Sequence, residues 1–159
     1  MAQKLADLLR DTIARELSQL EAFPPEEAAV KPANPAHWSP KEELGHLVDS
    51  AVNNHQRFVR AALHGEYTGP GYAQNDWVDL HAYQEMPWGH IVDLWFRFNA
   101  FLARVVAQIP DSALDTLCHV GPYPPETLGF VIQDYVVHMQ HHLDHLLGRP
   151  EVTKYPQSR

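Results

Sequence analysis

The sequence has a single cysteine, Cys118, so no disulfide can form within the chain. A lone thiol is typical of proteins from reducing compartments, and we therefore expect a cytoplasmic protein. Such a thiol could also act as a nucleophile, but nothing near it in the sequence indicates a lowered pKa. We interpret Cys118 as a small, partly buried apolar residue in a loop.

Basic residues are few and scattered, with 12 Lys and Arg against 20 Asp and Glu, which gives a formal charge of −8. Such a chain repels phosphate backbones, so we expect no nucleic acid partner. No segment approaches the roughly 18 apolar residues of a membrane span. Acidic residues from Asp7 onward and the lack of an apolar core also argue against an N-terminal signal peptide. We expect no membrane partner.

Proline and glycine are concentrated in three stretches, residues 24–40, 65–71 and 110–125, and are scarce between them. This spacing is typical of helices that are joined by irregular loops. The length of 159 residues suits one domain with its own core. We predict a single all-α domain over residues 1–159.

Four amphipathic segments are predicted to be long helices. They span residues 3–20, 40–63, 87–109 and 128–147. Ser39 and Glu42 form a capping box around Pro40 at the start of the second helix, and Thr127 is the expected N-cap of the fourth. A short helix is expected over Asn75–Tyr83, and loops over residues 66–71 and 111–126, the second with a possible extended turn. Four long helices with little strand pattern predict a four-helix bundle.

Eleven histidines are the compositional exception, and the last predicted helix holds four of them, in the segment DYVVHMQHHLDHLL. At about 100° per residue, His138 and His142 lie on one shoulder of the apolar face, one turn apart. Their imidazoles can therefore bind one ion. His141 points nearly opposite the apolar face and is expected to be exposed, while His145 shares the shoulder of His138 and competes for the same role. Asp134, one turn before His138, is placed to accept a ring N–H.

Six further histidines are expected at the surface, at helix ends or in loops. They are His37, His55, His64, His81, His90 and His119.

The second predicted helix could supply a third ligand. His46, Ser50, Asn53 and Arg57 form a polar stripe beside its apolar face, with Asp49 adjacent. The stripe is either a solvated face or the wall of a polar cleft. Its offset from the apolar face favours solvent, whereas its lack of Lys and Glu, which usually occupy exposed helix faces, favours a cleft. Periodicity leaves both open.

Three motifs occur in an order that resembles the DinB/YfiT-like metalloenzyme family over roughly residues 30–150. They are Trp38-Ser39 followed by GHLVDS, Arg57-Phe58, and DYVVHMQHHLDHLL. The resemblance implies a four-helix bundle of up-down-down-up type, often homodimeric, with a three-histidine metal site. By position, the implied ligands are His46, His138 and His142. Identified members of the family include bacillithiol- and mycothiol-dependent transferases, and others are described as metal-dependent hydrolases.

Three neutral imidazoles leave a coordination position open, as in catalytic rather than structural sites. We expect one divalent ion, with zinc first and nickel second. Our hypothesis is an enzyme that transfers a low-molecular-weight thiol to a small electrophile. One alternative is a hydrolase that uses metal-bound hydroxide, and another is a non-catalytic, metal-stabilised bundle in stress response. Asp49 is the candidate proton acceptor or ligand support, and Arg57 is the candidate anchor for a substrate carboxylate, or else a structural salt-bridge partner.

Overall fold

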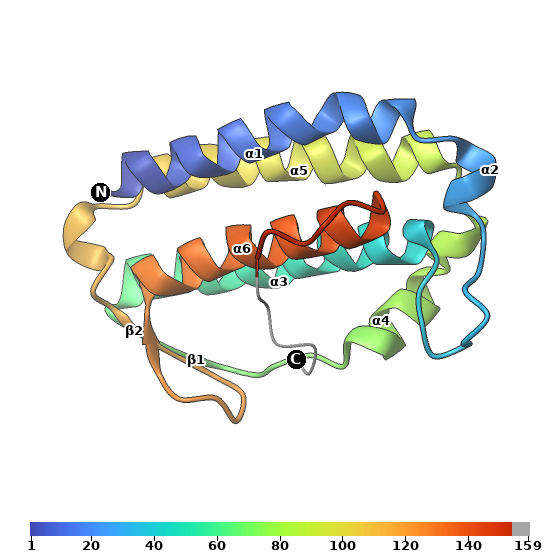
Figure 1. Ribbon diagram of the computed structural model, residues 1–159. Coiled ribbons are helices and arrows are strands. Elements are labelled where there is room, and N and C mark those ends of the chain that lie inside the picture. The colour runs from blue at the N-terminus through green and yellow to red at the C-terminus, as the bar shows by residue number, and fades with distance from the viewer. Residues whose placement is uncertain (154–159) are drawn as a thin grey trace.

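The computed structural model describes residues 1–153 as a bundle of four long helices with shorter elements around it (Figure 1). The long helices are α1 (Ala2–Ala22), α3 (Pro40–His64), α5 (Trp88–Ala107) and α6 (Leu128–Leu146). The short helices are α2 (Pro25–Ala28), α4 (Gln74–His81) and the 3-10 turns η1 (Tyr83–Glu85) and η2 (Asp111–Ala113). The four predicted helices are confirmed. Residues 154–159 of the predicted domain lie outside the described residues.

Local capping chemistry places the two helices that carry the polar motifs. The Ser39 hydroxyl accepts a hydrogen bond from the Glu42 amide, and the Glu42 carboxylate accepts one from the Ser39 amide at 2.8 Å. Gly65 ends α3 with φ 77°, in the left-handed region that favours glycine. The Thr127 hydroxyl caps α6 by accepting from the Phe130 amide at 3.2 Å. Both predicted N-caps are confirmed, and they fix where α3 and α6 begin.

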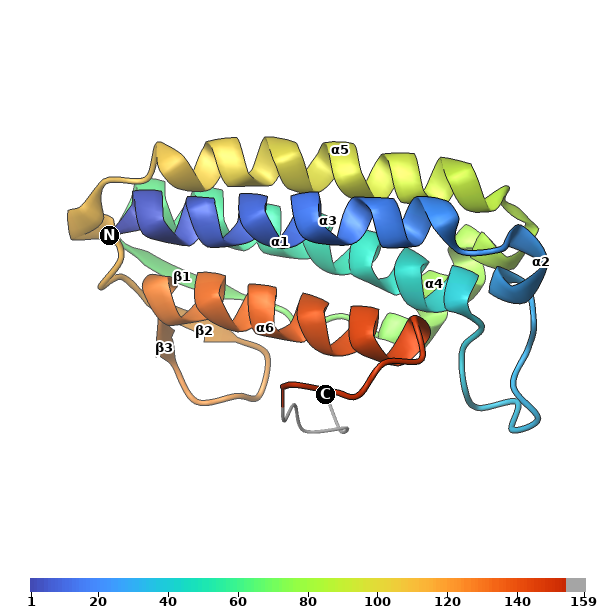
Figure 2. The same cartoon turned by 45° about the horizontal axis from the view of Figure 1, so that its top comes forward.

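The long helices form two layers around one core. α1 lies beside α5, and α3 lies beside α6, as Figures 1 and 2 both show. All four helices contribute side chains that are almost fully buried, among them Leu9, Leu47, Phe58, Trp95 and Ile132. None of the helices in residues 1–153 is both long and apolar enough to cross a membrane.

A small sheet covers the side of α3 and α6 that faces away from α1 and α5 (Figure 1). β1 (Glu66–Gly69) pairs in parallel with β2 (Leu117–Val120), which pairs antiparallel with β3 (Glu126–Thr127). The all-α prediction therefore holds for the bundle but is wrong for parts of the two predicted loops. These strands have at most four residues, too few for a readable alternation, and β1 pairs with a segment about fifty residues further along the chain.

The connection that includes α4 is held against α3 by a close contact. The predicted helix over Asn75–Tyr83 is confirmed as α4, and Tyr83 follows it in η1. The Tyr83 ring lies so close to Gly45 of α3 that a Cβ at position 45 would be 2.2 Å from it. The Tyr83 hydroxyl donates to Asp49 Oδ1 at 2.7 Å. Glycine at position 45 therefore lets the connection cross α3 next to His46.

This close contact predicts the outcome of two glycine substitutions. In Gly45→Ala the added methyl group overlaps the Tyr83 ring, and we expect the free energy of unfolding to fall by about 1–3 kcal/mol. Gly89→Ala in α5 is the matched control, because a Cβ there meets nothing within 4 Å. It should raise the free energy of unfolding by about 0.5–1 kcal/mol, since alanine favours helix. Urea unfolding measures both, and equal stability of the two variants would contradict the contact.

Candidate metal centre

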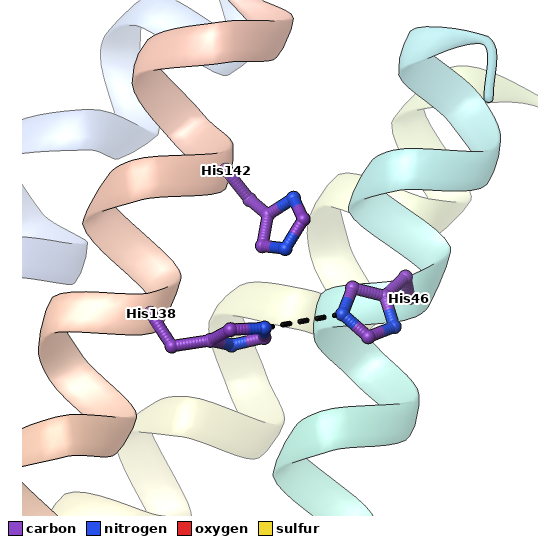
Figure 3. A group of neighbouring side chains, drawn as sticks. All are labelled: His46, His138 and His142. Atoms are coloured by element: carbon purple, nitrogen blue, oxygen red, sulfur yellow. Dashed lines mark hydrogen bonds between the residues drawn. The ribbon is translucent and has the colours of Figure 1, made fainter. Parts of the chain in front are cut away.

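Three imidazoles from two helices point into the space between α3 and α6 (Figure 3). His46 comes from α3, and His138 and His142 come from α6. One nitrogen from each ring lies within 4.8 Å of the other two, and the Nε2 atoms of His46 and His138 are 3.2 Å apart. His46 is 1% exposed. The structure thus brings together the three histidines that the sequence predicted as ligands.

Aromatic rings hold the His46 imidazole in place. The Trp38 ring packs on it with centroids 4.7 Å apart, and the Tyr72 ring is stacked with it at 6.4 Å. Trp38 lies just before α3, whereas Tyr72 lies between β1 and α4. Segments outside the bundle therefore restrict the orientation of this imidazole.

Glu43 is a buried carboxylate that the sequence analysis missed. It lies one turn before His46 on α3 and is 5% exposed. Its Oε1 accepts from His142 Nδ1 at 2.8 Å, and its Oε2 accepts from His145 Nδ1 at 2.8 Å. Because Nδ1 of His142 donates to Glu43, its Nε2 carries the lone pair that a metal ion needs. The three-residue spacing of Glu43 and His46, which places them on one helix face, could have revealed this role.

The protonation states suit metal binding. Burial, followed by repulsion from His142, lowers the pKa of His46 to about 3, so this ring is neutral. Burial acts to raise the pKa of Glu43, but the hydrogen bonds from His142 and His145 outweigh burial and lower the pKa below its ordinary value. Glu43 is therefore an anion that accepts from both imidazoles, and the neutral form of His46 is the form that binds metal.

The donor set fits a divalent ion. Two imidazole nitrogens at 3.2 Å need either a proton or a cation between them, because their lone pairs otherwise repel each other. The other ring nitrogen of His46, Nδ1, is buried without a hydrogen-bond partner among residues 1–153. A proton on Nδ1 leaves Nε2 as the donor toward the other two rings. Three imidazoles are a donor set that zinc and nickel both accept.

Asp49 is buried on α3 and is bound to the connection over α4. Its Oδ1 accepts from Tyr83 Oη at 2.7 Å and from His81 Nδ1 at 2.8 Å. Burial raises the pKa of Asp49, although these two hydrogen bonds act to lower it. Its Oδ2 has no hydrogen-bond partner within the described part of the chain. Asp49 is not among the residues that line the adjacent cleft.

The prediction that His141 is exposed is wrong, since this residue is only 9% exposed. The chain after α6 folds back, and a carboxylate oxygen of Glu151 comes within 3.5 Å of His141 Nδ1. His145, the competitor for the site, binds Glu43 and lies outside the group of three imidazoles. Helical phase alone could not show which side of α6 the returning chain covers.

The six histidines expected outside the core are confirmed as exposed or half-buried. Only His81 among them contacts the site region, through its hydrogen bond to Asp49.

A cleft of about 320 Å³ opens beside His46 and His138. Its α3 wall contains Ser50, Asn54 and Arg57, so the polar stripe, apart from Asn53, lines a cleft, which was one of the two interpretations left open. Helix α6 contributes Phe130, Val131, Asp134 and Tyr135 to the wall. The remaining lining residues come from the sheet, its loops and the start of α4: Gly71, Tyr72, Gln74, Cys118, Val120, Pro122, Tyr123, Pro124 and Glu126. Asn53 is turned back to its own helix and donates to the Asp49 carbonyl at 2.9 Å.

Arg57 lies at the end of this cleft remote from the imidazoles. Its Nη1 donates to Asn54 Oδ1 at 3.4 Å. Within residues 1–153 no carboxylate oxygen lies within 4.0 Å of its guanidinium, so the predicted alternative of a structural salt bridge is wrong for the described chain. A guanidinium on a cleft wall without a carboxylate neighbour can pair with an anionic ligand.

Cys118 also lines the cleft, from strand β2 rather than from a loop. Burial raises the pKa of its thiol to about 11, against a smaller lowering by the Arg57 charge. The thiol is therefore protonated near neutral pH, in agreement with the non-nucleophilic interpretation.

The contact of Glu43 with His142 predicts how metal affinity responds to substitution. Glu43→Gln keeps the size of the side chain but removes the charge that orients the His142 ring. We expect the affinity for zinc to fall about 10- to 100-fold, as measured by competition with a chromophoric chelator. His145→Ala is the control, because it removes the second partner of Glu43 but no member of the trio. Unchanged affinity in Glu43→Gln would show that this carboxylate does not orient the ligand.

Comparison with known proteins identifies the family and supports the fold. The profile of the DinB superfamily matches residues 8–146. A search of curated protein sequences finds no significant match. One similar solved structure is YfiT from Bacillus subtilis, described as a probable metal-dependent hydrolase with an unusual four-helix bundle topology. It is 18% identical, with a TM-score of 0.80 over 92% of this chain and 84% of YfiT, which supports the shared fold. Because the profile covers most of the sequence, this chain belongs to the DinB superfamily.

Proposed function

We propose that this protein is a divalent-metal-dependent enzyme that acts on a small molecule in the cleft, with His46, His138 and His142 as the metal ligands. The observation that carries this proposal is the meeting of three imidazoles from two helices at one end of an open cleft. A bound divalent ion, zinc first and nickel second, supplies a Lewis acid that lowers the pKa of a coordinated thiol or water.

The protein's own residues position and select the substrate. Glu43 orients His142, and Trp38 and Tyr72 restrict His46. Arg57 anchors a substrate carboxylate at the other end of the cleft. Asp49 acts indirectly, because its hydrogen bonds hold His81 and Tyr83 against α3 beside His46.

Transfer of a low-molecular-weight thiol to a small electrophile is our first proposal for the reaction. The thiol sulfur forms a bond to the electrophile as the leaving group departs, and the thiol proton is released to solvent. This reaction suits a site whose nearest buried carboxylates, Glu43 and Asp49, are already hydrogen-bonded to other side chains. A thiol whose pKa the metal lowers needs no additional base.

Hydrolysis is the second candidate, and it is favoured by one specific observation. Asp134 lies on the cleft wall one turn before His138, where its carboxylate could take a proton from an attacking water. The description of YfiT as a probable metal-dependent hydrolase also supports this candidate. The open cleft argues against the third alternative, a non-catalytic stress-response bundle in which the metal only joins α3 to α6.

Three further expectations remain proposals. We propose the up-down-down-up helix order, because α3 and α5 both begin at the end of the bundle near α2 in Figure 1. We propose a homodimer, which the exposed apolar side chains Leu94 and Phe101 on α5 support. We propose a cytoplasmic location, which suits a single free thiol.

Cobalt substitution distinguishes the two reactions. The visible absorption of the cobalt-loaded protein should change when 2-mercaptoethanol is added, because a thiolate is a soft ligand. With 1-chloro-2,4-dinitrobenzene present, thioether should form faster than in buffer, and this excess rate should vanish in His46→Ala. His55→Ala, on the same helix but outside the trio, is the control. An unchanged spectrum together with cleavage of ester or amide substrates would favour hydrolysis instead.

Metal removal predicts a change in stability. A metal ion that binds only the folded protein raises the free energy of unfolding by about 2.7 kcal/mol at a hundredfold excess over its dissociation constant. We expect this stabilisation in wild type and in His141→Ala, but not in His142→Ala. Thermal melting with and without zinc measures it. If the chelated and loaded wild-type proteins melt at the same temperature, the site does not bridge α3 and α6.

A further inference from the structure

We infer that the substrate is a two-ended molecule, with one end at the three imidazoles and a carboxylate at the other end that pairs with Arg57 across an apolar middle. This inference rests on the proposed function and names the substrate class for the same cleft. It follows from the placement of His46 and Arg57, the charges along the cleft and the chemistry of its central walls.

His46 and Arg57 lie on the same face of α3. They are 57 − 46 = 11 residues apart, which is about three turns and leaves an angular offset of only about 20°. The same spacing separates their Cα atoms by about 16 Å along the helix axis. Side chains in a helix lean toward its N-terminus, so the Arg57 side chain leans back toward His46. A ligand that reaches both groups therefore has an extended length of roughly 10–16 Å.

One charge gives the ligand a direction. Among the described residues that line the cleft, Arg57 is the only lysine or arginine. It lies at the end remote from the imidazoles, half-buried, with no carboxylate of residues 1–153 within 4.0 Å of its guanidinium. Pairing with a ligand carboxylate would give this guanidinium a partner of matching geometry. The acidic group of the substrate therefore belongs at the Arg57 end, away from the metal.

The central walls favour an apolar linker between these two ends. Val131 and Tyr135 from α6 and Val120 from β2 line the cleft together with Phe130. Two of the polar side chains on the α3 wall, Ser50 and Asn54, already share a hydrogen bond of 3.3 Å. A chain of methylenes or a planar ring would bury apolar area here without leaving polar groups unpaired.

A series of ω-mercapto acids tests the length and the charge together. Zinc-loaded protein is titrated by calorimetry with 3-mercaptopropionate, 8-mercaptooctanoate and 11-mercaptoundecanoate, each alongside its methyl ester. In wild type the acid of the shortest thiol should bind no more tightly than its ester, because its carboxylate cannot reach Arg57. At the length that spans the cleft, the acid should bind about 10- to 100-fold more tightly than its ester, as a charge-assisted hydrogen bond provides.

Two arginine variants show which charge is responsible. Arg57→Gln should abolish the preference for the long acid while leaving the affinity for the short thiol unchanged. Arg60→Gln is the matched control, because Arg60 lies one turn further along α3, is exposed and bonds Gln56 outside the cleft. Circular dichroism confirms that both variants are folded.

The outcomes separate this inference from the proposed function. If all the thiols change the spectrum of the cobalt-loaded protein but acids and esters bind equally at every length, the two-ended substrate is rejected and the metal-dependent enzyme stands. The inference is also rejected if Arg57→Gln keeps the preference for the long acid. If no thiol binds the metal-loaded protein at any length, the proposed thiol chemistry fails, and the inference fails with it.

Discussion

The geometry of the candidate metal centre depends on the hydrogen bonds that the Glu43 carboxylate accepts. A buried anion is costly unless it is paired, and Glu43 is paired with two imidazoles of α6, those of His142 and His145. This contact joins α3 to α6 at the level of the three histidines and selects the tautomer of His142. Since the three histidines come from two helices, any change in the α3–α6 contact would move His46 relative to the other two imidazoles.

The long helices were predictable because their determinants are local. The Ser39–Glu42 capping box and the Thr127 cap define helix starts within a few residues, and apolar periodicity defines the buried face. The sheet was not predictable for the opposite reason. Strand β1 pairs with β2 about fifty residues later, and neither strand is long enough to show its own periodicity. Only the folded bundle brings these two segments together.

The candidate site was likewise predictable only where its contacts are set by a single helix. Helical phase and family resemblance together predicted that His46, His138 and His142 would meet, because each lies on a shoulder of its helix beside the apolar face. Phase relates a side chain to its own helix, however, and not to segments that arrive from elsewhere. The exposure of His141 was therefore mispredicted, since the chain after α6 returns over it. The partners of Asp49 come from the connection over α4, so they were equally out of reach of periodicity.

The bundle and its connecting segments contribute different parts of the function. The helices carry the imidazoles and Glu43, whereas the sheet and the residues around α4 supply much of the opposite side of the cleft, including Tyr72 and Val120. Connecting segments tolerate sequence change better than packed helices do. A fold of this kind can therefore keep one metal centre while its cleft, and with it the substrate, changes. Arg57 belongs to neither part alone, because it extends from helix α3 into a space that the connecting segments help to enclose. A substitution at this position would therefore change the charge of the cleft and leave the three histidines in place.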